Sequence, residues 1–558
     1  MTPPRLRAMH GAERAALAAP LAFFALPLAL ALPLGLAQAS DAGAWRALFA
    51  DPQLPRALGL SLGSALVSSG LALAATLVLV THLHASALWS RLSRALAPML
   101  ALPHAAFAIG LALLVMPAGL FARLLAPLAG WSAPPDWATV NDPQGVGLTA
   151  VLLGKELPFL LWNTLALLHR PDVAAAVRAW LASGATLGYS HAAVWWRVLW
   201  PLLLPRLAWP LLAVLAYSLT VVDLALIVGP ASPPTLAVIA WQGLQHGDAA
   251  RNAEGAAAAT LLGAVLLALT LAWAGAYRIA QRAWQHAALN GQRRPAPRLG
   301  AAASRALLGG LLGLYASVAL LLLASSFVGV WTFPALLPQV WAGDAWQQVR
   351  DSSSVLGVSA GLAVFAALAS LALVLCWFET TPAAWDARVM PLVLAPLVVP
   401  GLLLMAGFYA LALRLALDGT LAGLAWVHTL VTLPYVFVAL APAWRSFDRR
   451  YEWTALALGR SRWAFGWRVK APMLAAPLAS ALAIGFAVSV AQYLPTQFIG
   501  AGRYATVTTE AVTLASGGQR HTAAAFAVLQ ALLPAIGFGL AAWVGRRQRT
   551  TMSRDAGT

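Results

Sequence analysis

The 558-residue chain is poor in charge and nearly free of cysteine. Only 10% of its residues are Asp, Glu, Lys or Arg, whereas 61% are hydrophobic. Water-soluble proteins carry about 25% charged residues, so this shortage excludes an ordinary soluble fold. The single cysteine, Cys376, lies in an apolar run, which excludes an internal disulfide and a Cys-x-x-Cys metal site.

Motifs of nucleotide and metal chemistry are also missing. No stretch matches the phosphate-binding pattern G-x4-GK[ST], and the nearest one, 147–156, has the wrong spacing and lies within an apolar run. The ten histidines show no metal-ligand spacing, and no catalytic constellation is recognisable. The sequence therefore predicts no catalytic residue, no metal site and no cofactor on this chain.

Long apolar runs are what the chain does have. A helix needs about 20 apolar residues to cross a bilayer core. Because unpaired backbone groups are not tolerated in lipid, and the runs are too long for barrel strands, we expect helices. The sequence thus predicts an all-α polytopic membrane protein in a lipid bilayer. The twelve predicted spans are 16–38, 58–81, 96–118, 146–168, 203–227, 256–276, 306–328, 354–377, 390–413, 421–443, 474–495 and 522–544.

The net charge of +17 predicts orientation rather than nucleic-acid binding. Most of the 36 Lys and Arg residues lie in short segments that share a side with both termini, and no soluble basic face exists. The positive-inside rule places these segments, and both termini, in the cytoplasm. Ala37-Gln38-Ala39 resembles a signal-peptide cleavage site, but the preceding run is longer than the roughly 7–15 apolar residues of a signal sequence. We therefore expect an uncleaved first span.

The two halves of the chain repeat one another. Residues 187–201 read LGYSHAAVWWRVLWP and residues 458–472 read LGRSRWAFGWRVKAP, with eight of fifteen positions identical at an offset of 271. A polar stretch, 277–305, separates six predicted spans from six. The repeat predicts two homologous halves, 1–290 and 306–558, joined by a cytoplasmic linker at 291–305.

Each repeated segment is predicted to form two short helices joined by a tight turn, and we call residues 173–201 and 445–472 the first and second elbows. Gly188 and Gly459 suit the left-handed conformation that ends a helix. Ser190 and Ser461 stand where the next helix needs an N-cap. A rigid elbow between spans is suited to receiving a push from a partner. The alternative is a loop kept only for packing.

In these motifs the chain resembles the double-length permeases of binding-protein-dependent ABC importers of the thiamine and ferric-iron type, and most closely their YnjC-like branch. The elbows resemble the EAA coupling loop of that family. The likeness is also carried by ALPHAAFAIGLALL (101–114), LLGKELPFLLW (152–162), AYSLTVVDLALIVGP (216–230) and QYLPTQFIGAGRYATVTTEAV (492–512).

The resemblance implies the type I importer (MetI-like) fold in a bacterial inner membrane. It also implies two copies of a cytoplasmic ABC ATPase, which bind ATP and Mg, and a periplasmic solute-binding protein that delivers a small solute. A twelve-span ion-coupled secondary transporter is the alternative. The residues expected to couple to the ATPase are Ala185, Gly188, Ser190, Arg197 and Pro201 in the first elbow, and Leu456, Gly459, Ser461, Arg468 and Pro472 in the second.

One departure from the family pattern concerns the glutamate of the EAA motif. Its position is Ala182 in the first elbow and Trp453 in the second, and Glu452 lies one residue too early. The ion pair that the glutamate makes elsewhere is therefore expected to be absent or shifted.

Three charges fall within predicted spans of the first half only: Lys155, Glu156 and Asp223. Charges inside a membrane are costly and tend to mark pathways or paired sites. Lys155 and Glu156 point about 100° apart on a helix, so we expect Lys155 to pair with Asp223. The charges then either brace two helices or line the translocation path.

Overall fold

The computed structural model describes residues 21–84, 86–289 and 298–555, and helices dominate them. Within these ranges, nine helices are long and apolar enough to cross a membrane, or up to twelve if each of three bent helix pairs is one span. The all-α polytopic prediction is confirmed. The described strands form one short antiparallel pair, β1 (Val328–Val330) and β2 (Val340–Trp341).

The first half begins with three helices before its long spans. In chain order its elements are η1 (Leu21–Ala25), α2 (Leu26–Gln38), α3 (Ala42–Ala50), α4 (Leu54–Leu83), α5 (Leu88–Ala101), α6 (His104–Val115), α7 (Leu120–Ala129), α8 (Val146–Leu168), α9 (Pro171–Thr186), α10 (His191–Val194), η2 (Trp195–Leu199), α11 (Trp200–Leu203), η3 (Leu204–Leu207), α12 (Ala208–Thr220), α13 (Asp223–Val228), α14 (Leu236–Leu244) and α15 (Ala249–Leu289).

The second half begins with a single long helix and the strand pair. Its helices are α16 (Arg298–Ser325), α17 (Asp344–Asp351), α18 (Ser353–Thr380), η4 (Ala383–Trp385), α19 (Asp386–Val398), α20 (Gly401–Arg414), α21 (Leu421–Arg445), α22 (Arg450–Ala457), α23 (Arg462–Phe465), η5 (Gly466–Lys470), α24 (Ala471–Met473), α25 (Ala475–Val490), α26 (Leu494–Gly500), α27 (Val507–Ser516) and α28 (Arg520–Asp555).

The sequence repeat is also a repeat of structure. At the offset of 271, α10 starts where α23 starts, η2 matches η5, and α13, α14 and α15 match the starts of α26, α27 and α28. Even a single buried contact recurs: Ser61 Oγ accepts from the N–H of Leu236 at the start of α14, and Ser359 Oγ accepts from the N–H of Val507 at the start of α27. Each hydroxyl satisfies a backbone donor that a helix start leaves unpaired.

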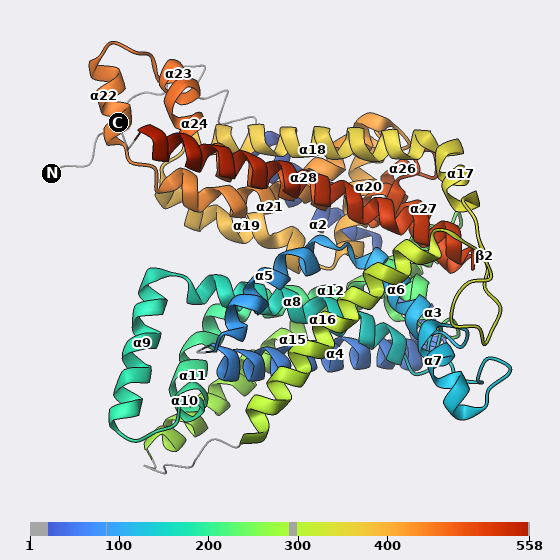
Figure 1. The fold of residues 1–558 in the computed structure, drawn as a ribbon. Coiled ribbons are helices and arrows are strands. Elements are labelled where there is room, and N and C mark those ends of the chain that lie inside the picture. The colour runs from blue at the N-terminus through green and yellow to red at the C-terminus, as the bar shows by residue number, and fades with distance from the viewer. Residues whose placement is uncertain (1–20, 85, 290–297, 556–558) are drawn as a thin grey trace.

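Each half packs one of its early helices against the other half. α2 of the first half packs against α20 of the second, and α16 of the second packs against α6 of the first (Figure 1). Glycine permits both crossings, because a Cβ at Gly407 would clash with the Ala31 carbonyl of α2, and one at Gly110 would clash with Val318 of α16. Small residues let helix backbones approach closely in membranes.

Several predicted spans are each divided between two helices. Predicted span 390–413 consists of α19 and α20, bent by 101°. Predicted span 96–118 divides between α5 and α6, and predicted span 203–227 ends one helix at Thr220 and starts another at Asp223. The first two breaks fall at Pro400 and Pro103, where proline disfavours helix at the preceding residue.

The predicted linker is also corrected in part. Residues 298–305 are the first residues of α16 rather than linker, while 291–297 lie outside the described residues, as do 16–20 of the first predicted span.

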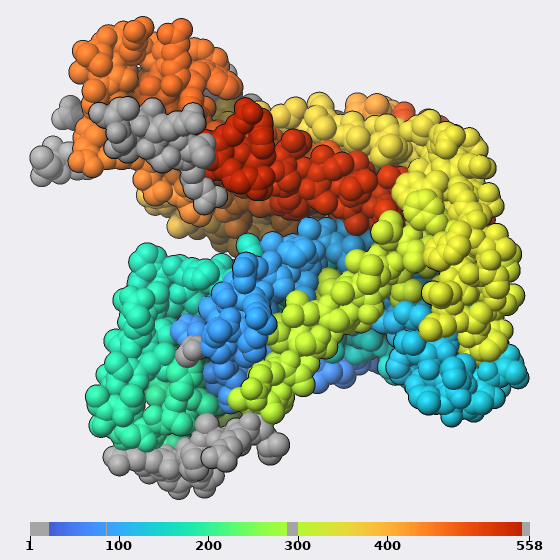
Figure 2. Space-filling view, in the orientation of Figure 1, coloured from blue at the N-terminus to red at the C-terminus, as the bar shows by residue number. Residues whose placement is uncertain are grey.

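Both elbows lie at the same end of the molecule, with α9 and α10 below and α22 and α23 above in the view of Figure 1. The space-filling view shows a cleft between the two halves that opens at this end (Figure 2). At the opposite end, residues of both halves, including Met116, Leu226 and Arg520, line a cavity of about 250 Å³.

Candidate functional site

The turn of each elbow has the predicted glycine conformation. Gly188 has φ +78° and Gly459 has φ +74°, a region that residues with a Cβ seldom adopt. The N–H of Gly188 donates to the Ala185 carbonyl, and the N–H of Gly459 donates to the Leu456 carbonyl, at 3.0 Å in both cases. These bonds satisfy carbonyls at the helix end, so both turns are fixed by the same backbone contacts.

The second helix of each elbow starts at the predicted serine. Ser190 Oγ accepts from the N–H of Ala193 at 3.3 Å, and Ser461 Oγ accepts from the N–H of Ala464 at 3.2 Å. One turn of α-helix is followed in both elbows by a π-helical turn, η2 or η5. The predicted helix–turn–helix is therefore present in both halves.

Each elbow is tied to the last helix of its own half. The Tyr277 hydroxyl of α15 donates to the carbonyl of Pro201 at 3.1 Å, and Gln548 Nε2 of α28 donates to the carbonyl of Pro472 at 3.2 Å. Tyr277 and Gln548 are themselves separated by 271 residues. The two prolines thus occupy equivalent, anchored places.

The predicted arginines differ in their surroundings. The half-buried Arg197 places its guanidinium 5.7 Å from the centre of the Tyr189 ring, whereas Arg468 is exposed. In the second elbow, Glu452 pairs across the turn with Arg462 at 3.6 Å. The glutamate that is displaced from the EAA position therefore has a partner within its own elbow.

The two elbows also begin alike electrostatically, outside the membrane-spanning segments. A side-chain hydrogen bond from Arg170 lowers the pKa of Asp172, and one from Arg450 lowers the pKa of Asp448. The side chains of Asp172 and Asp448 are 56% and 38% exposed, so these pairs fix loop geometry more than stability.

The first elbow rests on a buried cluster of aromatic and histidine side chains. Trp195 and Trp200 are fully buried, and Trp200 Nε1 donates to Thr81 Oγ1 of α4 at 2.9 Å. The His84 and His191 rings stack at 6.4 Å. Burial, then the neighbouring His191 and His169, lower the pKa of His84. The first elbow is therefore held mainly by apolar burial around neutral rings.

The second elbow is held by charge instead. Lys470 of η5 forms an ion pair with Glu379 at the end of α18, at 2.5 Å, and its ammonium lies 4.0 Å from the centre of the Trp444 ring. Trp444 Nε1 donates to the same Glu379 carboxylate at 2.9 Å. At the offset of 271, Lys470 corresponds to the buried Leu199 of the first elbow.

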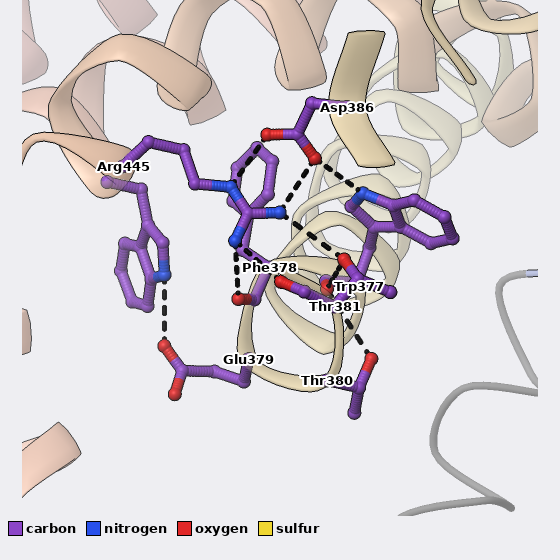
Figure 3. Close-up of polar contacts among 8 residues, drawn as sticks. Trp377, Phe378, Glu379, Thr380, Thr381, Asp386 and Arg445 are labelled. Atoms are coloured by element: carbon purple, nitrogen blue, oxygen red, sulfur yellow. Dashed lines mark hydrogen bonds and ion pairs between the residues drawn. The ribbon is translucent and has the colours of Figure 1, made fainter. Parts of the chain in front are cut away.

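A second ion pair, between Arg445 and Asp386, joins helix ends beside the contact of Lys470 with Glu379. Arg445 Nε lies 2.7 Å from Asp386 Oδ2, and its Nη1 donates to the carbonyls of both Phe378 and Thr381. Trp377 Nε1 donates to Asp386 as well (Figure 3). The ends of α18 and α21 and the start of α19 are thereby joined. Sequence reasoning missed this network, although opposite charges flanking three consecutive apolar runs were a signal for it.

Within the membrane, Lys155 does not pair with Asp223, so that prediction is wrong. Its Nζ donates to the carbonyls of Met99 and Leu102 at 3.1 and 2.6 Å. These carbonyls belong to the last turn of α5, whose helical bonding ends at Pro103. The ammonium replaces the missing backbone donors and meets the negative end of the helix dipole.

The two acidic residues have separate surroundings. Glu156 Oε1 accepts from Ser68 Oγ at 3.3 Å and also from Ser218 Oγ, while Oε2 has no hydrogen-bond partner among the described residues. Asp223 starts α13 and lies close enough to Tyr217 and Tyr493 to interact with both electrostatically. Asp223 thus stands where the halves meet, and Glu156 stands inside the first half.

The second half has a polar contact at the place equivalent to Glu156–Ser218. Ser489, which corresponds to Ser218, lies 2.9 Å from His428 Nδ1, and His428 Nε2 lies 3.1 Å from Thr496 Oγ1. His428 therefore has a partner on each ring nitrogen. Its two partners lie 61 and 68 residues away along the chain, so no local pattern indicated them.

Over most of its length the chain is similar to the inner membrane ABC transporter permease protein YnjC of Escherichia coli (strain K12). The two are 38% identical over 511 residues, which cover 90% of this chain and 91% of that protein. An aligned region of this length includes both elbows. No family model matches the chain.

Proposed function

Because the chain belongs to the family of inner-membrane ABC transporter permeases, we propose that it supplies the whole membrane-spanning part of an ABC importer, with two permease halves of the type I fold in one polypeptide. The observation that carries the proposal is the pair of matching elbows at one end of the molecule. Each elbow receives one copy of a cytoplasmic ABC ATPase, which binds ATP and Mg.

The exposed side chains of the elbows support this role. Leu187 and Leu458, at equivalent places beside the turn glycines, are 58% and 75% exposed. Trp453 and Trp463 add exposed aromatic surface to the second elbow. Exposed apolar surface beside a rigid turn suits docking into a groove of a partner protein.

The way each elbow is seated suggests how a push is transmitted. From Ser190 the helical path runs through α10, η2, α11 and η3 into α12, whereas the second elbow leads through α23, η5 and α24 into α25 with a bend of 80° after Met473. Movement of the elbows relative to one another would therefore tilt α12 and α25 and change the cleft between the halves. With the elbows in the cytoplasm, the described conformation opens inward (Figure 2). A periplasmic binding protein delivers the solute at the other end.

The test is the stoichiometry of the assembled transporter. We expect native mass spectrometry of the chain, co-expressed with its ATPase, to find one copy of this chain with two ATPase copies. A complex that contains two copies of this chain would overturn the proposal, because two fused halves leave no place for a second copy.

A matched pair of variants then locates the docking surfaces. Leu187→Asp and Leu458→Asp each place a charge at an exposed site, so we expect each to reduce ATPase binding without reducing membrane insertion. Leu337→Asp, at a 72% exposed leucine in the loop between β1 and β2 and outside the spans, is the control. Full ATPase binding by both elbow variants would show that the ATPases dock elsewhere.

A further inference from the structure

The Glu156 side chain is a buried carboxylate without a cationic partner among the described residues. It is only 4% exposed and lies on α8, which packs against α4 and α12. The adjacent Lys155 directs its ammonium to the carbonyls that end α5. Its charge is thus already compensated by a helix terminus, and Glu156 is left with neutral neighbours.

The polar groups beside the Glu156 carboxylate are serine hydroxyls. Ser68 and Ser218 contact Oε1, and Ser69 lies beside the carboxylate with its hydroxyl buried and unpartnered among the described residues. Ser68 Oγ also reaches the Ala65 carbonyl of its own helix at 3.3 Å, and Ser218 Oγ reaches the Val214 carbonyl at 2.8 Å.

The alternative acceptors matter because a hydroxyl has one proton to donate. When Ser68 and Ser218 donate to their own helices, their lone pairs face the carboxylate. Together with Ser69 Oγ and the two carboxylate oxygens, this arrangement supplies five oxygen atoms able to act as ligands. Oxygen donors with a single negative charge are suited to a hard monovalent cation.

The second half shows that the fold does not need a carboxylate here. Ser489 replaces Ser218, and its partner is His428, both of whose ring nitrogens have a partner. Aligned on the Leu-Pro pairs at 157–158 and 433–434, Glu156 corresponds to Thr432. Thr432 Oγ1 is also buried without a partner among the described residues. Only Glu156, however, leaves a carboxylate oxygen buried without a donor in that part of the chain, and such an oxygen calls for a ligand.

We propose that Glu156, Ser68, Ser69 and Ser218 bind a sodium ion. The ion neutralises the carboxylate and joins α4, α8 and α12, the last of which continues from the first elbow. The sequence prediction of no metal site rested on His and Cys spacing, which a site of one carboxylate and three hydroxyls does not display. The proposal is independent of ATPase coupling, since it concerns the chain alone.

The experiment measures thermal unfolding of the purified full-length chain in detergent at constant ionic strength, with sodium chloride exchanged for potassium or N-methylglucamine chloride. A ligand that binds only the folded state raises the Tm with its concentration. We expect a saturable rise with sodium, matched by saturable binding of radioactive sodium. Glu156→Gln is expected to abolish both effects. Ser69→Ala is expected to weaken the affinity for sodium about tenfold, as the loss of one neutral ligand would.

Ser489→Ala is the matched control, because it removes the equivalent serine of the second half and should leave the sodium response intact. Equal Tm values in sodium and N-methylglucamine would overturn the proposal, and so would a sodium response that survives Glu156→Gln. A Tm that depends on pH through Glu156, with no effect of sodium, would assign the site to a proton instead. If Glu156→Gln does not fold, Ser69→Ala and Ser218→Ala decide the question.

Discussion

The two elbows share the same turn but are attached to the helix bundle by different contacts. We call the buried cluster around Trp195 and Trp200 the first seat, and the ion pair of Lys470 with Glu379 the second seat. Glycine, serine cap and proline contacts recur at an offset of 271, yet the first elbow rests on buried Trp195 and Trp200, whereas the second is tied by Lys470 to Glu379. Local geometry is thus repeated closely while the attachment to the bundle is not. The turn of an elbow and its attachment to the bundle are therefore separable, and the two seats should respond differently to mutation, salt and pH.

The largest expected effect is at the first seat. Trp200→Ala removes a fully buried indole and its bond to Thr81, at a cost of about 3–5 kcal/mol of stability. Folded yield and thermal unfolding in detergent measure it. Trp467→Ala is the control, since Trp467 is 61% exposed on the second elbow and its loss should cost under about 0.5 kcal/mol. Equal losses would mean that the aromatic cluster does not hold the first elbow.

A smaller effect is expected at the second seat. Lys470→Met or Glu379→Gln removes one ion pair whose carboxylate is 58% exposed, so the coupling free energy in a double-mutant cycle should be about 0.5–1 kcal/mol. In reconstituted transporter we expect less solute moved per ATP hydrolysed. High salt should screen the ion pair of Lys470 with Glu379 and so also lower the solute moved per ATP in the wild type. It should leave the defect of Trp200→Ala unchanged. A coupling free energy of zero would show that the pair of Lys470 and Glu379 does not stabilise the second elbow.

The smallest expected effect is one of pH on the first seat. Burial lowers the pKa of His84 below its ordinary value of 6.5, so the neutral ring is the form that the fold favours. The stability it contributes is complete above pH 6.5 and declines as pH falls below 6.5 through the folded-state pKa, because the unfolded chain takes up a proton first.

Thermal unfolding between pH 7.5 and 5.5 checks this, with His84→Gln as the variant in which the decline should be smaller. An identical pH profile in wild type and His84→Gln would contradict the stated role of burial at this ring.

The sequence alone predicted the parts of this molecule that depend on near neighbours. Apolar runs of span length require helices in lipid, and the glycine and serine of each elbow act on backbone groups within five residues. Pro103 and Pro400 also act locally, because each divides a predicted span into two helices.

Only the tertiary structure decided the contacts between distant segments. Lys155 meets carbonyls 53 and 56 residues away rather than Asp223, and Arg445 meets Asp386 across 59 residues. The packing of α2 and α16 against the opposite half likewise depends on close approach at Gly110 and Gly407. Composition indicates that a buried charge needs a partner, but several partners satisfy the same electrostatics. Which one is chosen depends on the packing of helices whose positions no local pattern fixes.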